Sequence, residues 1–311
     1  MRILLTGGNG FLGSRVLKYL IECGYQEKNI FIPRSVDYDL THNYDTKILF
    51  QDSSPDIVIH LAAVVGGIGA NRKYPGEYFY DNMMMGMNVI EHSRKNNIQK
   101  FVQVGTVCSY PKYCRVPFLE EDMWEGFPEE TNAPYGVAKK ALGVMLQAYY
   151  NQYGFKSIIL LPCNLYGPND NFDDKSSHVI PALIKKFVNA VDSNLKEVSC
   201  WGDGSATREF LHVDDAARAV VLAINKCSDA QHINLGYSEE ISIRQLAEMI
   251  KDICGFKGKI VWDSSMPNGQ PRRLLDTTKV KNLLGWEPNI KFRDGLVDTI
   301  NWWTNLQKGE K

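Results

Sequence analysis

The 311-residue chain lacks the features of a membrane protein or a nucleic-acid-binding protein. No apolar run approaches the roughly 20 residues that a membrane-spanning helix needs. A short apolar strand is predicted directly after Arg2, which leaves no room for the charged and apolar regions of a secretory leader. We therefore expect no leader, no membrane partner and a cytoplasmic location. The 35 Lys and Arg residues balance 36 Asp and Glu residues, which gives no general attraction for nucleic acid. Any anionic ligand must therefore be held by a local group of cations.

The chain also lacks the cysteine spacing of a metal site. Its seven cysteines are scattered at positions 23, 108, 114, 163, 200, 227 and 254, and none form the paired clusters typical of zinc ligands. An odd number of scattered cysteines indicates reduced thiols, as in a cytosolic compartment. There are no internal repeats or low-complexity tracts. We therefore predict no metal and an ordinary globular protein.

Short apolar runs alternate with segments of helical periodicity through the first half of the chain. The pattern predicts strands at 3–6, 30–32, 57–61, 101–104 and 157–161, with long helices at 75–96 and 134–153. This alternation is typical of an α/β fold with a doubly wound parallel sheet, the Rossmann type. We predict a dinucleotide-binding domain over 1–162, to which 212–236 returns, and a smaller α/β substrate domain over 163–311.

Three glycines follow the first predicted strand with the spacing G-x-x-G-x-x-G. They are Gly7, Gly10 and Gly13, and Phe11 and Leu12 open the helical pattern between the last two. Glycine permits a tight turn and lets the backbone approach a pyrophosphate at the amino end of the helix. The motif predicts that these five residues bind a dinucleotide cofactor.

The end of the second predicted strand indicates which dinucleotide is bound. An NAD-selective fold usually has an acidic residue there for the ribose 2′-hydroxyl, whereas this chain has Arg34. Arginine can pair with a 2′-phosphate, so we predict NADP(H). The alternative is that Arg34 is a surface charge and that Asp37 or Asp39 contacts the ribose.

Tyr135 and Lys139 are spaced i, i+4 within the helix predicted at 134–153, so both side chains lie on one face. A lysine cation beside a tyrosine favours the phenolate and lowers the tyrosine pKa. Thr106 follows the strand predicted at 101–104 and can hydrogen-bond the same substrate carbonyl. These three residues predict proton transfer coupled to hydride transfer.

Further motifs resemble the GDP-L-fucose synthase family, within the extended short-chain dehydrogenase/reductases that act on nucleotide sugars. The resemblance extends over nearly the whole chain and rests on the segments 55–63, 65–68, 108–112, 164–168, 177–181, 208–215 and 271–276. It implies an NADPH-dependent 3,5-epimerase and 4-reductase of GDP-4-keto-6-deoxymannose. It also implies a homodimer formed through the helices predicted at 75–96 and 134–153.

The resemblance carries roles to particular residues of this chain. It implies cofactor contacts from Leu61, Ala62, Ala63, Tyr135, Lys139 and His178. We also predict that Asp39, after the second strand, contacts the cofactor ribose. The resemblance implies contacts to the GDP portion of the substrate from Lys185, Lys186 and Arg208, with Val179 and Trp201 nearby, and further substrate contacts from Asn164 and Arg272. The alternative for Lys185 and Lys186 is a solvated helix face.

The same resemblance implies that Cys108 and His178 are the acid/base pair for epimerisation. A 4-keto group acidifies the protons at C3 and C5, and the unperturbed pKa values of a thiol and an imidazole bracket neutrality. The alternatives are a small buried hydrophobic residue for Cys108 and a helix cap or surface residue for His178.

One departure from the family bears on the substrate. Thr106 stands where serine is common, and its added methyl group narrows the pocket. A second hypothesis is therefore a C4 reductase, with or without epimerisation, of another GDP-4-keto-6-deoxy sugar such as a capsular heptose. A third is a nicotinamide-binding sensor or scaffold without chemistry, which would have little need for Tyr135 and Lys139.

Overall fold

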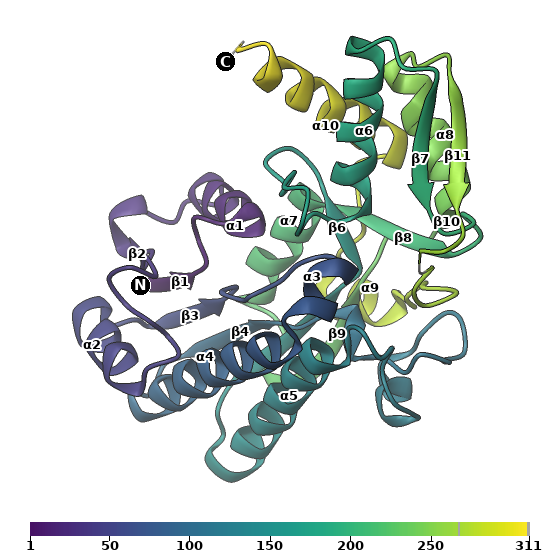
Figure 1. Cartoon of the computed structure of the whole chain (residues 1–311). Coiled ribbons are helices and arrows are strands. Elements are labelled where there is room, and N and C mark those ends of the chain that lie inside the picture. Colours follow the sequence, from purple (N-terminus) through teal and green to yellow (C-terminus); the bar gives the residue numbers. More distant parts are fainter. Residues whose placement is uncertain (267, 310–311) are drawn as a thin grey trace.

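The computed structural model describes residues 1–266 and 268–309, and its centre is a parallel sheet (Figure 1). Among these residues six strands pair in the order β2-β1-β3-β4-β5-β9, and every pair is parallel. The strands are β1 (Ile3–Thr6), β2 (Ile30–Phe31), β3 (Ile57–His60), β4 (Lys100–Val104), β5 (Ser157–Pro162) and β9 (Asp229–Leu235). The order reverses beside β1, so the predicted doubly wound α/β fold is confirmed.

Helices cover both faces of this sheet. One face carries α1 (Phe11–Glu22) and α7 (Val213–Ala223), which pack against each other. The other face carries α2 (Asn43–Ser53), α4 (Pro75–Lys95) and α5 (Ala133–Tyr153), and α4 lies beside α5 (Figure 1). The two long helices predicted from the sequence are thus confirmed to within one residue at each end.

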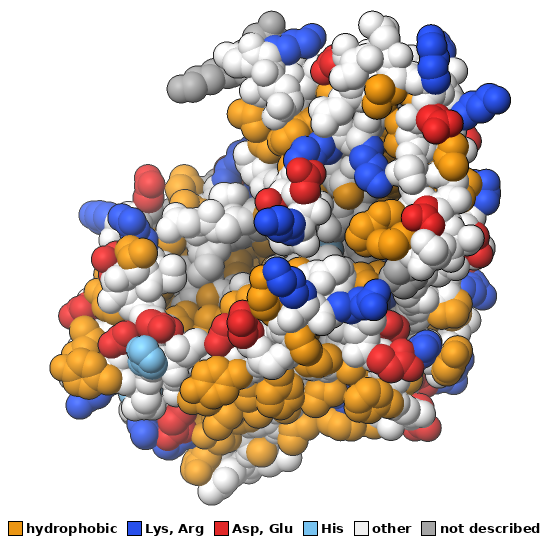
Figure 2. All heavy atoms as spheres, in the orientation of Figure 1, with side chains coloured by type: hydrophobic (Ala, Val, Ile, Leu, Met, Phe, Trp, Pro, Cys, Tyr) orange, Lys and Arg blue, Asp and Glu red, His pale blue; other side chains and the backbone are white. Residues whose placement is uncertain are grey.

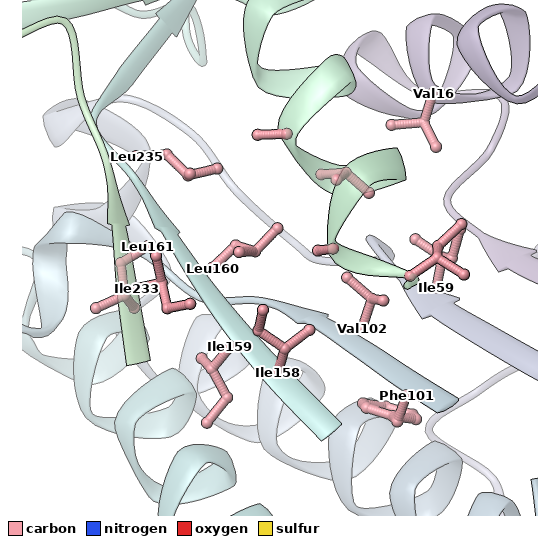
Figure 3. Packing of buried hydrophobic residues seen from close by; sticks show 14 of the residues in the cluster. Val16, Ile59, Phe101, Val102, Ile158, Ile159, Leu160, Leu161, Ile233 and Leu235 are labelled. Carbon is pink, nitrogen blue, oxygen red and sulfur yellow. The ribbon is translucent and has the colours of Figure 1, made fainter. Parts of the chain in front are cut away.

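Strand β5 is apolar over most of its length because both of its faces are covered. In β5 the side chains of Ile158, Ile159, Leu160 and Leu161 are all at most 2% exposed. Figure 3 shows them packed with neighbours from the adjacent strands and helices. A buried parallel strand reads as a continuous hydrophobic run rather than as an alternation. Burial of this cluster holds the carboxyl ends of the strands in fixed positions.

Elements after β5 form a second, smaller part of the molecule with its own hydrophobic cluster, which includes Phe187, Leu246 and Trp303. Strands β6 (Asn164–Tyr166), β8 (Thr207–His212) and β10 (Glu240–Ser242) form one small sheet, and β7 (Glu197–Trp201) pairs with β11 (Lys259–Asp263). The helices of this part are α6 (Val179–Asp192), α8 (Ile243–Cys254) and α10 (Phe292–Gln307), whereas α9 (Thr278–Leu284) packs beside β9 and α3 (Ile68–Lys73) contacts α4. The domain boundary at 162 remains a prediction.

No helix within residues 1–266 and 268–309 is long and apolar enough to cross a bilayer. The same residues contain no cluster of three or more His, Cys, Asp or Glu side chains that could hold a metal ion.

Candidate active site

A cleft of about 1150 Å³ lies at the carboxyl ends of the central strands, where the two hydrophobic clusters meet. Figure 2 shows the surface hollowed in this region. Both parts of the chain line the cleft. It contains all the residues predicted to bind cofactor or substrate or to act in catalysis, except Arg272.

The glycine motif forms one end of the cleft, between β1 and α1. Gly7 has a φ of +72°, and a Cβ there would lie 2.7 Å from the amide nitrogen of Ala62. A Cβ on Gly13 would lie 2.0 Å from the carbonyl oxygen of Gly7. Gly10 is the N-cap of α1 and provides no side-chain cap, so the first amide groups of the helix face the cleft uncapped. This backbone cradle fits the diphosphate of a dinucleotide.

The end of β2 carries the residues that were expected to distinguish NADP from NAD. Arg34 is exposed and lines the cleft, whereas Asp37 does not line it. Asp39 lines the cleft, but its Oδ1 accepts bonds from the Thr41 amide at 2.9 Å and the Thr41 hydroxyl at 2.7 Å. The hydroxyl bond is the largest cause that lowers the Asp39 pKa. One oxygen of Asp39 is thus already used within its own turn.

Tyr135 and Lys139 lie on α5 and both line the cleft, as their spacing predicts. Lys139 is 4% exposed, and its Nζ donates to the carbonyl oxygen of Val104 at 3.3 Å. Burial lowers the pKa of Lys139 to about 8. Burial also raises the pKa of Tyr135, and charge on Cys108 raises it further, while a hydrogen bond with Thr106 lowers it.

These directions correct one prediction made from the sequence. Lysine charge was expected to lower the Tyr135 pKa, but desolvation dominates and the net shift is upward. The reason is that a phenolate loses more solvation in this buried position than the neighbouring groups return.

Thr106 and Cys108 belong to a short 3₁₀ turn, η2 (Val107–Ser109), that follows β4. Thr106 caps this turn, because its Oγ1 accepts a hydrogen bond from the Cys108 amide at 3.1 Å. The turn is fastened to α5, since Ser109 Oγ donates to the Gly136 carbonyl oxygen at 3.0 Å. A Cβ on Gly136 would lie 2.2 Å from the Cys108 carbonyl oxygen. The Cys108 side chain is half-buried and reaches the cleft.

His178 reaches the same cleft from the start of α6. It occupies the N-cap position, but its side chain makes no capping bond, so the alternative of a capping side chain is wrong. The preceding loop contacts the segment after β3, where the Gly67 amide donates to the Ser176 carbonyl oxygen at 3.0 Å. The imidazole is open to the cleft yet surrounded by its walls. That desolvation, together with the charge of Arg273, lowers the His178 pKa.

Two buried guanidinium groups line the cleft without an acidic partner. Arg208 is 8% exposed and Arg273 is 7% exposed, and no carboxylate of the described residues forms an ion pair with either. Burial, followed by the charge of Arg273, lowers the pKa of Arg208 to about 9. A buried cation without a counter-charge is costly, so this pair is suited to a bound anion.

The two adjacent lysines of α6 differ in their contacts. Lys186 donates to the Ser199 carbonyl oxygen at 2.8 Å, and its Nζ lies 6.0 Å from the ring centre of Trp201, which is 52% exposed. Lys185 instead pairs with Asp174 at 2.7 Å. Lys185 therefore supports the loop that leads to His178, and Lys186 lies beside an available aromatic face.

Arg272 requires a correction. It does not line the cleft, and its guanidinium forms an ion pair with Glu240 on an exposed surface. Its neighbour Arg273 lines the cleft instead. Successive residues of an extended segment point to opposite sides, so the prediction chose the wrong member of the pair.

Sequence reasoning also missed Asp170, which follows β6 and lines the cleft. Its Oδ2 is buried without a hydrogen-bond partner among the described residues. Burial raises the pKa of this carboxyl to about 7. Nothing in the sequence distinguishes Asp170 from its neighbours Asn169 and Asn171 in a polar loop.

Residues 3–236 match the model of the NAD dependent epimerase/dehydratase family. The chain is 41% identical over 303 residues to a probable GDP-L-fucose synthase 1 of Oryza sativa subsp. japonica, covering 97% of this chain and 92% of that protein.

Two solved structures share the fold over nearly the full length. A GDP-6-OMe-4-keto-L-xylo-heptose reductase from C. jejuni superposes with a TM-score of 0.90 at 29% identity, covering 98% of each chain. A GDP-L-fucose synthetase from Naegleria fowleri bound to NADP gives 0.87 at 30% identity, covering 99% of this chain and 96% of that one. The chain therefore belongs to the NAD dependent epimerase/dehydratase family, among its GDP-L-fucose synthases.

Proposed function

We propose that this protein catalyses the NADPH-dependent 3,5-epimerisation and 4-reduction of GDP-4-keto-6-deoxymannose to GDP-L-fucose. The observation that carries the proposal is the single cleft itself. It brings a dinucleotide cradle, a tyrosine–lysine pair, a thiol, an imidazole and two buried guanidinium groups into one volume. The relatives named GDP-L-fucose synthase support the choice of substrate.

Residues from one end of the cleft would hold the cofactor. The uncapped start of α1 and the turn at Gly7 would receive the diphosphate, and Arg34 would pair with the 2′-phosphate. Leu61, Ala62 and Ala63 line the cleft next to this turn. When bound, NADPH supplies the hydride that reduces C4 of the sugar.

Tyr135, Thr106 and Lys139 act at the sugar ketone in this proposal. The hydroxyl groups of Tyr135 and Thr106 donate hydrogen bonds to O4, and Tyr135 then gives its proton to that oxygen. The buried Lys139 amine lies on the same helical face and stabilises negative charge left on the tyrosine. The high pKa of Tyr135 keeps the phenol protonated, as a proton donor must be.

Cys108 and His178 exchange the protons of C3 and C5. One group removes a proton from the carbon, and the electron pair moves toward O4, where Thr106 and Tyr135 hydrogen-bond the oxygen. The other group then returns a proton on the opposite face. Cys108 lies in η2 and His178 at the start of α6, so the two groups reach the cleft from separate elements; inversion requires that they act on opposite faces of the sugar.

The GDP portion would bind at the other end of the cleft. Arg208 provides buried positive charge for the diphosphate, and Lys186 adds a second cation. The exposed face of Trp201 can pack against the sugar–nucleotide, and Val179 and Asn164 complete the lining. Because the cations have no acidic partners to displace, an anionic substrate gains their full attraction.

The second candidate is a C4 reductase of another GDP-4-keto-6-deoxy sugar such as a heptose. The resemblance in fold to the heptose reductase from C. jejuni favours it. The decisive assay incubates the protein with GDP-4-keto-6-deoxymannose and NADPH in heavy water. Deuterium at C3 and C5 of a reduced product would support the first proposal. Turnover without deuterium would remove the epimerase activity, and turnover only on a heptose analogue would establish the alternative.

We also propose a homodimer that assembles through α4 and α5. These helices expose Phe79, Tyr80, Met87, Val144, Tyr150 and Tyr153, and Figure 2 shows hydrophobic surface gathered over them. Sedimentation velocity tests this proposal, and a purely monomeric species at micromolar concentration would contradict it. The free thiols of all seven cysteines, which lie in the described ranges, support a reducing cytoplasmic location.

A further inference from the structure

The Cys108 side chain has one charged neighbour in hydrogen-bond contact. Arg273 Nη1 donates to Cys108 Sγ at a distance of 3.7 Å, across 165 positions of the sequence. Arg273 itself is 7% exposed. A guanidinium that donates to sulfur stabilises negative charge on the sulfur, because the interaction is strongest with the thiolate.

Arg273 is held in this position by Gln270. The Nε2 group of Gln270, which is 3% exposed, donates to the carbonyl oxygens of Pro111 at 2.9 Å and Lys112 at 3.0 Å. Two carbonyl partners require the amide nitrogen on that side, so Oε1 faces the other way. There it accepts a bond from Arg273 Nε at 2.7 Å.

The segment that carries Arg273 is fixed on its other side as well. The Leu275 amide donates to the buried Glu209 carboxylate at 3.0 Å. Phe118, which follows the Cys108 loop, pairs with this segment through bonds from its amide to Leu274 and from the Asp276 amide to its carbonyl oxygen. Hydrogen bonds on both sides therefore fix the segment that carries Arg273 relative to the loop after Cys108.

Other charged groups near the sulfur do not contact it in this way. Charge on Cys108 raises the pKa values of Tyr135 and Arg208, and the charge of Glu129 also raises the pKa of Arg208. Arg208 directs its donors to the carbonyl oxygens of Thr207 and Asn268. Only Arg273, among the described residues, hydrogen-bonds the sulfur.

We propose that Arg273, oriented by Gln270, is a positioning residue that holds the Cys108 sulfur toward the cleft and stabilises it as a thiolate. This deepens the proposed function, since it rests on Cys108 acting as an acid/base group. The thiolate forms by losing its proton to solvent, and it can then accept a proton from the substrate carbon. The same guanidinium also disfavours a proton on His178, so His178 takes up a proton from solvent before it returns one to the substrate.

The test measures the thiolate directly rather than turnover. Alkylation of Cys108 by iodoacetamide is followed against pH by peptide mass mapping, in the whole protein without substrate. Arg273→Gln should move the midpoint of Cys108 alkylation upward by about one pH unit or more, which is the usual effect of a cation within 4–6 Å. Arg273→Lys should restore part of the difference.

Arg272→Gln is the matched control, because Arg272 pairs with Glu240 outside the cleft. Its midpoint should equal that of the unmodified protein. An unchanged midpoint in Arg273→Gln, or an equal rise in Arg272→Gln, would overturn the proposal. Failure of the epimerase proposal is distinguishable, since it would leave the alkylation shift intact but yield no deuterium in the product.

A second variant covers the case in which Arg273→Gln does not fold. Rapid alkylation of the buried Cys163 would reveal unfolding. Gln270→Met then decides, because it removes the orienting amide and leaves the charge in place. A higher midpoint for Cys108 in the folded variant would support the proposal, and an unchanged midpoint would contradict it.

Discussion

Tyr135 and Lys139 share one helix that packs on the central sheet, whereas Cys108 and His178 reach the cleft from two separate elements, η2 and the start of α6. The separation of the first pair is set by helical geometry alone. That of the second pair depends on contacts between distant segments, such as the bond from the Gly67 amide to the Ser176 carbonyl oxygen. We infer that the reductive groups are locally determined and that the proton-exchange groups are determined by tertiary structure.

The largest expected effect tests the reductive side. Tyr135→Phe removes the phenol that donates a proton to O4, and reduction should fall by roughly 10²–10⁴-fold, the usual contribution of a positioned acid. NADPH consumption measures the effect. Tyr150→Phe, on the exposed face of the same helix, is the control. Undiminished reduction in Tyr135→Phe would remove the proposed mechanism.

The next effect tests the tertiary contact on the exchange side. A Cβ on Gly67 would lie 2.5 Å from the Ser177 carbonyl oxygen, so Gly67→Ala must push the loop that carries His178. A displacement near 1 Å can cost about 10²-fold in rate. Deuterium incorporation should slow by about that factor, while NADPH binding is retained.

Gly69→Ala is the control for this change. Gly69 lies in α3, and a Cβ there would meet only the Lys175 carbonyl oxygen, at 3.9 Å. It should therefore be tolerated. Equal losses in the two variants would mean that the Gly67 contact does not position His178. The inference that tertiary contacts set the position of the proton-exchange groups would then be wrong.

A third prediction concerns the effect of the buried Lys139 amine on the free energy of unfolding. Burial lowers the Lys139 pKa from 10.5 to about 8, so protonation of this amine opposes folding. The unfolded chain binds one more proton between these values, and stability should rise with pH across that window. Below about pH 8 the penalty is at its full value, at most roughly 3 kcal/mol.

Lys139→Met should consequently unfold at higher denaturant concentration than the parent protein at pH 7, although it is less active. The difference should shrink as the pH rises from about 8 toward 10.5. Chemical denaturation at several pH values measures it. A variant that is less stable at pH 7 would show that the amine contributes more through its bond to Val104 than it costs by desolvation.

The smallest effect concerns the cofactor. Arg34→Ala should raise the KM for NADPH by about 10-fold, the lower end for a charge-assisted hydrogen bond, and leave the KM for NADH nearly unchanged. Deuterium exchange at C3 and C5 without cofactor should not change. Asp39→Asn tests the alternative: if Asp39 contacts the ribose, this variant, rather than Arg34→Ala, should impair use of NADH.

Much of the fold and half of the site follow from local sequence patterns. The glycine spacing, the continuous apolar strand at Ile158–Leu161 and the spacing of Tyr135 and Lys139 each encode geometry within a few residues. The sequence could not tell Arg272 from Arg273, because the phase of an extended segment is set by what packs against it. Nor could it predict the direction of the Tyr135 pKa shift, since burial is a property of the whole fold.

The close approach of Gly136 to the Cys108 carbonyl oxygen bears on how this enzyme could be re-engineered. Backbone meets backbone there, so the catalytic turn and α5 form one wall that cannot be reshaped without disturbing Thr106, Cys108 and Tyr135 together. Another part of the lining consists of side chains from α6 and β7, where Val179, Lys186 and Trp201 lie. Libraries intended to broaden the range of accepted sugars should therefore vary these side chains and leave Gly136 intact.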